Sequence, residues 1–256
     1  MYRFAFKTLA FILIFFQCND LPRDNVLDPG NPNSYQSSVI LVEAFVNTNN
    51  PFPYNEWALQ ALDSLEVIYG SKIVIVEYHR DTQEFSDPYS QPLIVEPLYE
   101  KYVQNSVIKT KGVPDIFING YKNRIQGASS VESVLSRVNT VLSSETGLNN
   151  YFTLEPTDIV LGDNQLRISC KIARLGNQSA SNLLLRAILV KRINSQALKR
   201  VAIHIVKTEQ ISKMEAGDIR TIDFEPIVIS QVPDFIILSV TSANELVVYQ
   251  NLKADL

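Results

Sequence analysis

Hydrophobic and polar positions divide the chain into a first half with alternating strand and helix patterns and a second half with strand patterns alone. Residues 38–46 form an apolar run typical of a buried strand, and residues 54–69 repeat apolar side chains at the spacing of an amphipathic helix. Gly70 should end this helix, and a second apolar run covers residues 72–78. This β-α-β order requires a parallel strand pair with a right-handed crossover. The buried face of the helix should consist of Trp57, Ala58, Ala61, Leu62, Leu65 and Ile68.

The same half continues with a second helix, a hairpin and a closing helix. Apolar spacing predicts the second helix over residues 93–104, and a short apolar strand follows Gly112-Val113-Pro114. Asn119-Gly120 is a strong signal for a hairpin turn, so residues 121–127 should return as the next strand. Residues 129–144 form the last helix of the pattern. We therefore expect one α/β domain over residues 38–147.

The second half, residues 148–256, shows no helical period and instead repeats short alternating strands. Such strands, separated by polar turns, predict an all-β sandwich of immunoglobulin-like type, with a barrel as the alternative. Alternation places Cys170 on the same face as Ile168 and Ile172, where it should be a small core residue. The predicted strands are Gln165–Ile172, Leu183–Lys191, Arg200–Lys207, Ile219–Phe224, Phe235–Thr241 and Leu246–Asn251.

The N-terminus has the pattern of an export signal. Arg3 and Lys7 precede an apolar run over residues 9–16, about half of the ~20 residues that a membrane-spanning helix needs. Cys18 follows where bacterial lipoproteins carry their acylated cysteine, so residues 1–18 predict a lipoprotein-type signal peptide. An ordinary signal peptide that contains a cysteine is the alternative. Residues 19–37 are polar and rich in turn formers, which indicates a flexible tether after the predicted lipid anchor.

Composition and charge exclude several classes of function. The 256-residue chain is 46% hydrophobic with a net charge of −4 and no cluster of Lys and Arg among aromatics, so we expect no nucleic-acid partner. Its 2 His, His79 and His204, cannot build a His-rich metal site. No Gly-rich phosphate loop and no G-x-S-x-G nucleophile motif is present. The sequence therefore predicts no cofactor, no bound metal and no catalytic residue.

The segment from Glu43 to Tyr54 resembles the active-site loop of the thioredoxin superfamily without its cysteines. In that superfamily a buried strand delivers a C-x-x-C motif to a helix N-terminus, which stabilises a thiolate. Aligning the strands places Asn50 and Pro53 at the two cysteine positions. Neither residue can form a thiolate or a disulfide. The resemblance therefore implies a thioredoxin-like scaffold in which the loop, including Phe52, has the conformation of the superfamily's active-site loop but no redox chemistry.

The Gly112-Val113-Pro114 segment strengthens this resemblance. Thioredoxin-like proteins hold a cis-proline opposite the active-site loop in a similar segment, which is followed by an apolar strand and a turn. The resemblance implies a cis peptide bond before Pro114 and a Val113 backbone that is open to an extended ligand. A trans Pro114 at the start of an edge strand is the alternative.

The order of leader, thioredoxin-like domain and β-sandwich resembles the twenty-eight-kilodalton outer-membrane-protein-related lipoproteins of Bacteroidota. The matching stretches are residues 39–45, 112–114, 203–206 and 245–250. Many members of that family carry C-x-x-C-P where this chain has Asn50-Pro51-Phe52-Pro53-Tyr54. The resemblance implies a bacterial envelope protein that is lipid-anchored to the outer membrane, but the missing cysteines put any redox role in doubt.

Two further features near the predicted cleft have both a structural and a functional interpretation. His79 ends the second strand, where it is either a hydrogen-bonded structural residue or part of the cleft. Residues 77–102 are rich in aromatic and acidic side chains, and these either line a ligand surface or cover the sheet.

The sequence supports three hypotheses. The first is a non-catalytic envelope lipoprotein that binds a protein or peptide through Asn50, Phe52, Pro53, Tyr54, Val113, Pro114 and His79. The second is an enzyme, either one related to thiol-disulfide oxidoreductases that uses Cys170 or an unrelated hydrolase. The third is a structural envelope spacer without a specific ligand. Assays of disulfide exchange and partner capture distinguish them.

Overall fold

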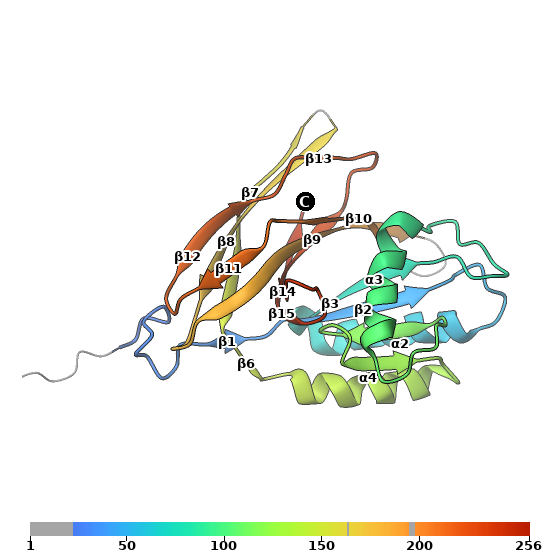
Figure 1. The fold of residues 1–256 in the computed structure, drawn as a ribbon. Coiled ribbons are helices and arrows are strands. Elements are labelled where there is room, and N and C mark those ends of the chain that lie inside the picture. Colours follow the sequence, from blue (N-terminus) through green and yellow to red (C-terminus); the bar gives the residue numbers. More distant parts are fainter. Residues whose placement is uncertain (1–22, 163, 195–197) are drawn as a thin grey trace, which may run out of the picture.

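The computed structural model describes residues 23–162, 164–194 and 198–256, and shows a β-rich fold with a helical layer (Figure 1). Within these ranges no helix is long and apolar enough to cross a membrane. The predicted signal peptide and Cys18 lie outside the described residues. The elements are β1 (Gln36–Ser37), β2 (Ile40–Val46), α2 (Tyr54–Tyr69), β3 (Ile73–His79), α3 (Pro92–Asn105), β4 (Asp115–Ile118), β5 (Asn123–Gln126), α4 (Val131–Glu145), β6 (Asn149–Asn150), β7 (Phe152–Gly162), β8 (Gln165–Arg174), β9 (Ala180–Asn194), β10 (Leu198–Lys207), β11 (Ile211–Met214), β12 (Ile219–Asp223), β13 (Ile227–Val228), β14 (Phe235–Ser242) and β15 (Val248–Asp255).

The first half contains the predicted β-α-β unit followed by the predicted hairpin. β2 and β3 pair in parallel and α2 connects them, with the limits that the apolar spacing predicts. Gly70 ends the helix with a φ of +54°, a backbone region that glycine adopts without steric cost. β4 pairs antiparallel with β2 and then with β5, and the turn between β4 and β5 begins at Asn119-Gly120. These strands follow the sheet order β3-β2-β4-β5.

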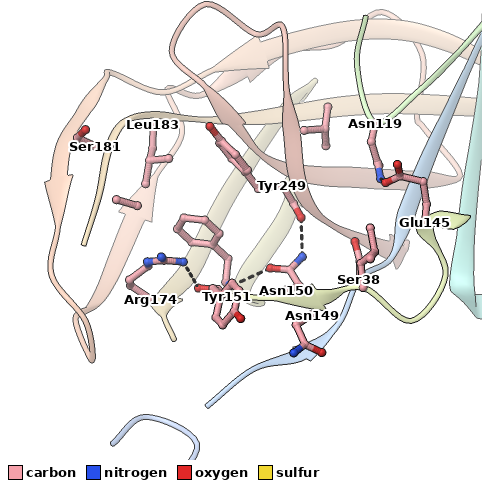
Figure 2. Close-up of a pocket in the computed structure, with 14 residues that line it drawn as sticks. Ser38, Asn119, Glu145, Asn149, Asn150, Tyr151, Arg174, Ser181, Leu183 and Tyr249 are labelled. Carbon is pink, nitrogen blue, oxygen red and sulfur yellow. Dashed lines mark hydrogen bonds between the residues drawn. The ribbon is translucent and has the colours of Figure 1, made fainter. Parts of the chain in front are cut away.

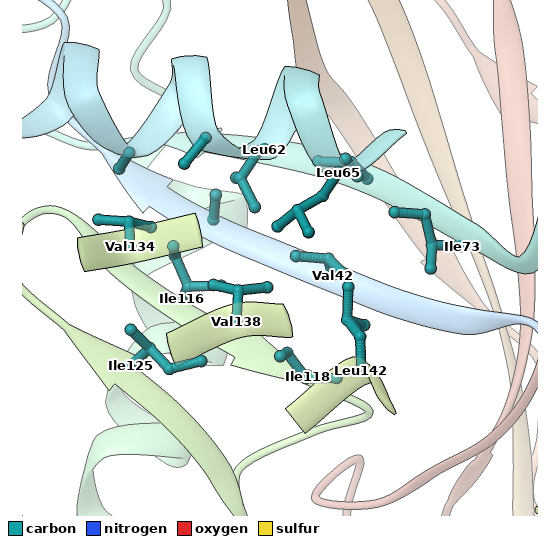
Figure 3. Packing of buried hydrophobic residues seen from close by; sticks show 14 of the residues in the cluster. Val42, Leu62, Leu65, Ile73, Ile116, Ile118, Ile125, Val134, Val138 and Leu142 are labelled. Atoms are coloured by element: carbon teal, nitrogen blue, oxygen red, sulfur yellow. The ribbon is translucent and has the colours of Figure 1, made fainter. Parts of the chain in front are cut away.

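Helices α2 and α4 cover one face of this sheet, and their apolar side chains form a continuous core with it (Figure 3). Leu62, Leu65 and Leu142 are fully buried there. Two residues of the predicted buried face of α2 are not buried in the structure. Ile68 is 63% exposed, and Trp57 is only partly buried. Successive steps of three residues drift around an α-helix, so Ile68 lies beyond the buried stripe and Leu59 joins it instead.

The second half contains two packed sheets. One is the four-stranded sheet of β7, β8, β12 and β13, and the other contains β9, β10, β11, β14 and β15. Side chains of β8 and β9 meet between them, and Cys170, Ile168 and Ile172 are all fully buried in this core. The prediction that Cys170 is a core residue is therefore confirmed.

The two halves share a sheet and a core. β10 pairs in parallel with β3 through Val201 and Glu77, which makes a single nine-stranded sheet. The face of the first-half sheet opposite α2 and α4 packs against α3 and against residues of β9, β10, β14 and β15. The sequence predicts two separate units, because alternation within each strand gives no information about pairing between halves. β3 would otherwise be an open sheet edge, and β10 covers it.

Residues 23–37 also differ from the flexible tether that their composition predicts. Ser34 is buried, its hydroxyl donates to the carbonyl of Val26, and it accepts the N–H of Gly176 from the second half. β1 pairs antiparallel with β6. Turn-forming residues here build successive hydrogen-bonded turns that pack on the sandwich, which composition alone does not distinguish from a mobile chain.

Candidate functional site

The loop between β2 and α2 lies beside the start of β4. Phe45 pairs with Asp115, so the next residue of β2, Val46, lies opposite Pro114 and the loop leaves the sheet at this edge. The peptide bond between Val113 and Pro114 is cis, as the resemblance implies, and not trans as in the alternative. Neither the N–H nor the C=O of Val113 bonds to any other residue within the described ranges.

Two asparagines fix the first part of this loop from below. Asn47 is fully buried, and its side-chain amide donates to the carbonyls of Arg80 and Phe85 at 2.8 and 2.7 Å. Its backbone N–H donates to the side chain of Asn55, in the first turn of α2, at 3.2 Å. The loop therefore depends on buried polar contacts rather than on the disulfide that a C-x-x-C motif would form.

A buried chain of charged groups lies directly beneath the loop. The carboxylate of Asp87 accepts from the backbone N–H and the hydroxyl of Thr48 at 2.5 and 3.0 Å. The same carboxylate contacts Nδ1 of His79 at 3.1 Å, and Nε2 of His79 contacts Glu77 at 3.3 Å. Glu77 in turn accepts the backbone N–H of Arg200, on β10, at 3.0 Å. His79 thus lies between two carboxylates, and the network runs from the loop into the second half.

These contacts determine the charge on His79. Burial alone lowers the pKa of this imidazole, but its hydrogen bonds to Asp87 and Glu77 and their negative charges outweigh burial and raise it. Burial likewise acts to raise the pKa of Asp87, but the bonds from His79 and from the backbone N–H groups of Thr48 and Tyr89 hold it below its ordinary value. Both shifts favour the charged pair of a protonated His79 and an ionised Asp87. The His79 side chain supports the loop from the buried side, and only 1% of its surface is exposed.

The outer part of the loop presents aromatic surface to solvent. Phe52 and Tyr54 are 53% and 43% exposed, and their rings stack with centroids 5.8 Å apart. Tyr54 also contacts Trp57 edge-on at 5.9 Å. The side chain of Asn50 accepts the N–H of Phe52 at 3.0 Å and so shapes the turn. Pro53 is the residue before the helix and accepts the N–H of Trp57 with its carbonyl.

Three tyrosines of the aromatic segment over residues 77–102 belong to the core rather than to this surface. Tyr78 and Tyr102 are fully buried, and their hydroxyls donate to the carboxylate of Glu43 at 3.1 and 2.9 Å. Tyr99 is also buried and donates to Asp115. The hypothesis that these tyrosines line a ligand surface is therefore wrong. Each belongs to a buried polar network that hydropathy does not reveal.

Glu43 has a charged partner from the second half. Nη2 of Arg186, on β9, lies 2.9 Å from the Glu43 carboxylate, and both side chains are fully buried. Burial lowers the pKa of Arg186, but the charge of Glu43 outweighs it and holds the pKa well above the ordinary value. Nε of Arg186 has no hydrogen-bond partner within the described ranges. This ion pair joins β2 to β9 at the centre of the shared core.

Cys170, the cysteine of the described residues, lies on β8 in the second half and not in this loop. Cys170 is fully buried in the sandwich, and burial raises the pKa of its thiol to about 11. A thiol in that state carries little thiolate at neutral pH. Across the described part of the chain, no group of three or more His, Cys, Asp or Glu side chains has the arrangement of a metal site.

The structure adds three residues to those predicted from sequence. Asn47 and Asn55 hold the loop, and Asp87 clamps Thr48 to His79. An asparagine directly after a buried strand is the one signal that could have identified Asn47. The role of Asp87 depends on a loop that folds back over β3, and several other acids in residues 77–102 have the same local pattern.

No known protein family matches this sequence, and no curated protein is significantly similar to it. Among solved structures, HBP35 of Porphyromonas gingivalis has a TM-score of 0.63 at 13% identity, and the match covers 86% of this chain and 76% of that one. A structure from Agrobacterium tumefaciens has a TM-score of 0.54 at 13% identity, covering 85% of this chain and 94% of that one. Both likenesses extend over most of the chain and show a shared overall fold.

Proposed function

We propose that this protein is a non-catalytic binding protein of the bacterial cell envelope, and that the loop after β2 binds an extended polypeptide. The observation that carries the proposal is the combination of a braced loop with an exposed aromatic pair. Phe52 and Tyr54 stand out from a loop that Asn47 and the His79 network hold rigid. Rigid aromatic surface binds with little entropy cost, and tyrosine is enriched at binding hot spots.

The backbone of Val113 supplies the second part of the proposed cleft. Its N–H and C=O have no partner in the described residues, and it precedes the strand that lies beside the loop. An extended peptide that meets such a segment gains main-chain hydrogen bonds, while its side chains contact neighbouring pockets. The peptide would run between Val113 and the aromatic pair.

We propose further that the first half is a thioredoxin-like domain and the second half an immunoglobulin-like sandwich. The sheet order β3-β2-β4-β5 with a β-α-β unit, a hairpin and a closing helix supports the first assignment. Sheets of β7-β8-β12 and β15-β14-β9-β10 packed face to face support the second. An anchor at Cys18 and an outer-membrane location remain part of this proposal, and the likeness to a protein from a Bacteroidota species is consistent with them.

A binding assay with a defined probe tests the cleft. Permanently unfolded, carboxymethylated α-lactalbumin should quench or shift the fluorescence of Trp57, which contacts Tyr54. Replacing both Phe52 and Tyr54 by alanine should weaken this binding about tenfold or more, since exposed aromatic hot spots are worth about 2 kcal/mol. Tyr35→Ala, at a tyrosine with 38% exposure outside the loop, is the matched control.

Equal binding by the double variant and the wild type would refute the cleft, and absence of binding would favour the structural spacer. The enzymatic alternative has its own test. We expect no reduction of insulin disulfides by the wild-type protein. Turnover that Cys170→Ser abolishes would establish thiol chemistry at the sandwich core instead.

A further inference from the structure

A second candidate site lies at the other end of β2, where the two halves meet. A cavity of about 400 Å³ is lined by residues of the first half, including Asn119 and Glu145, and of the second half, including Arg174 and Val248 (Figure 2). Ser38, just before β2, also lines it, whereas the loop of the proposed cleft follows the end of that strand. Small-ligand sites often occupy such junctions, and this volume is in their usual range.

Arg174 is the first unusual feature of this cavity. Its side chain is buried with 8% exposure, yet it forms no ion pair with any carboxylate in the described residues. Nε donates to the carbonyl of Gln178 and Nη1 to that of Tyr151, both at 2.9 Å, while Nη2 has no hydrogen bond to any residue that the structure describes. Burial lowers the pKa of Arg174, and the phenols of Tyr151 and Tyr249 oppose this shift without reversing it. A buried cation of this kind gains from an anionic partner.

Glu145 is the second unusual feature. Its carboxylate accepts from the amides of Asn119 and Asn123 at 3.3 and 3.1 Å, and no Lys or Arg of the described ranges pairs with it. It is also the last residue of α4, where the helix dipole disfavours negative charge. Arg174 and Glu145 lie on opposite sides of the cavity in Figure 2. The rest of the lining mixes apolar side chains, among them Leu148, Leu183 and Val248, with polar and aromatic ones.

We propose that this cavity binds a small zwitterion, an amino acid or short peptide, with its carboxylate at Arg174 and its ammonium group at Glu145. Each end of such a ligand supplies the counter-charge that one side chain lacks. The apolar lining suits an aliphatic side chain. The site is separate from the proposed cleft, so this inference does not depend on the loop after β2.

Ligand-observed NMR titration of the full mature chain tests the proposal with three probes, L-leucine, Ala-Leu and Ala-Leu-Ala. At least one should show saturable binding at or below about 10 mM. N-acetylation and C-terminal amidation of the probe that binds should each weaken it about tenfold, because each removes one charge-assisted hydrogen-bonded contact. Arg174→Gln and Glu145→Gln should each have the same effect.

Three controls separate binding from folding. Arg192→Gln removes an exposed arginine that pairs with Asp255 on the same half, and should leave binding unchanged. Arg174→Lys keeps the positive charge and should retain binding within a few-fold. This variant still tests the carboxylate end of the site if Arg174→Gln fails to fold. Glu145→Gln keeps an acceptor for Asn119 and tests the ammonium end alone.

Several outcomes would overturn the inference. They are absence of saturable binding by all three probes, equal binding of capped and uncapped peptides, and binding that depends on Arg174 but not on Glu145. The last result would show a site for a simple anion.

Discussion

The buried ion pair between Glu43 and Arg186 gives the sharpest test of the fold, and we predict that Arg186→Met is strongly destabilising. Both side chains are fully buried, and their contact at 2.9 Å joins β2 to β9. Within the described residues, removing the arginine leaves the Glu43 carboxylate with the hydroxyls of Tyr78 and Tyr102 as its partners. Breaking a buried pair in this way costs about 3–5 kcal/mol, out of a total stability of about 5–15 kcal/mol.

The double variant Glu43→Gln/Arg186→Met should recover part of this loss. A glutamine at position 43 carries no charge, and its amide can accept from one tyrosine hydroxyl and donate to the other. We therefore expect the two substitutions to be non-additive, with an interaction energy of roughly 2–3 kcal/mol. Arg192→Met is the matched control, because Arg192 also lies on β9 but pairs with Asp255 at the surface. Its cost should be about 0–1 kcal/mol.

Urea unfolding measures these differences. The chain has 1 Trp, so the fluorescence of Trp57 reports on α2, and far-UV circular dichroism reports on the whole protein. If the fluorescence and circular dichroism transitions coincide, the free energy of unfolding can be obtained from a two-state analysis. The single variant should also lower the Tm by roughly 6–20 °C. A loss below about 1 kcal/mol for Arg186→Met, or strict additivity in the double variant, would refute the buried pair.

Three further predictions concern pH, thiol reactivity and a tight turn. Because the native pKa of His79 is raised, its stabilisation should be complete below about pH 6.5 and should be lost as the pH rises through the native value. His79→Gln should abolish this decline in urea unfolding between about pH 5 and 9, and an unchanged profile would contradict the pairing. Ellman's reagent should modify Cys170 only after unfolding, since burial raises the pKa of this thiol to about 11; rapid modification of the native protein would show otherwise. Gly120→Ala should cost at least about 2 kcal/mol more than Gly147→Ala, because both have φ near +90° but of the two only Gly120 would bring its Cβ against a backbone oxygen, that of Leu246. Similar melting temperatures for the two variants would contradict that contact.

Local patterns predicted the elements of this fold well, and pairings between distant segments poorly. The helix over Tyr54–Tyr69 and the burial of Cys170 follow from side-chain spacing alone. The contact between Glu43 and Arg186 joins residues that are 143 positions apart, and each looks like an ordinary surface charge in sequence. A charge is buried only when the fold supplies its partner, so burial of this kind requires knowledge of the tertiary structure.

In the candidate cleft, too, the local features were predictable and the contacts between distant segments were not. The cis bond before Pro114 follows from the resemblance of a short segment, and the positions of Asn50 and Pro53 follow from the strand before them. The support beneath the loop could not be predicted, because Asp87 reaches Thr48 only through the return of a long connection over β3. The cavity between the halves could not be predicted either, because Arg174 and Glu145 belong to segments that the sequence assigns to different domains.

The pairing of β10 with β3 makes the protein unsuitable for dissection into modules. A fragment that ends near residue 147 would lose the strand that covers β3 and would leave Glu43 without its arginine. Such a fragment would present a bare β-edge to other copies of itself and should aggregate. Truncated forms, domain swaps and chimeras should therefore keep residues 23–256 together and place any fusion partner outside this range.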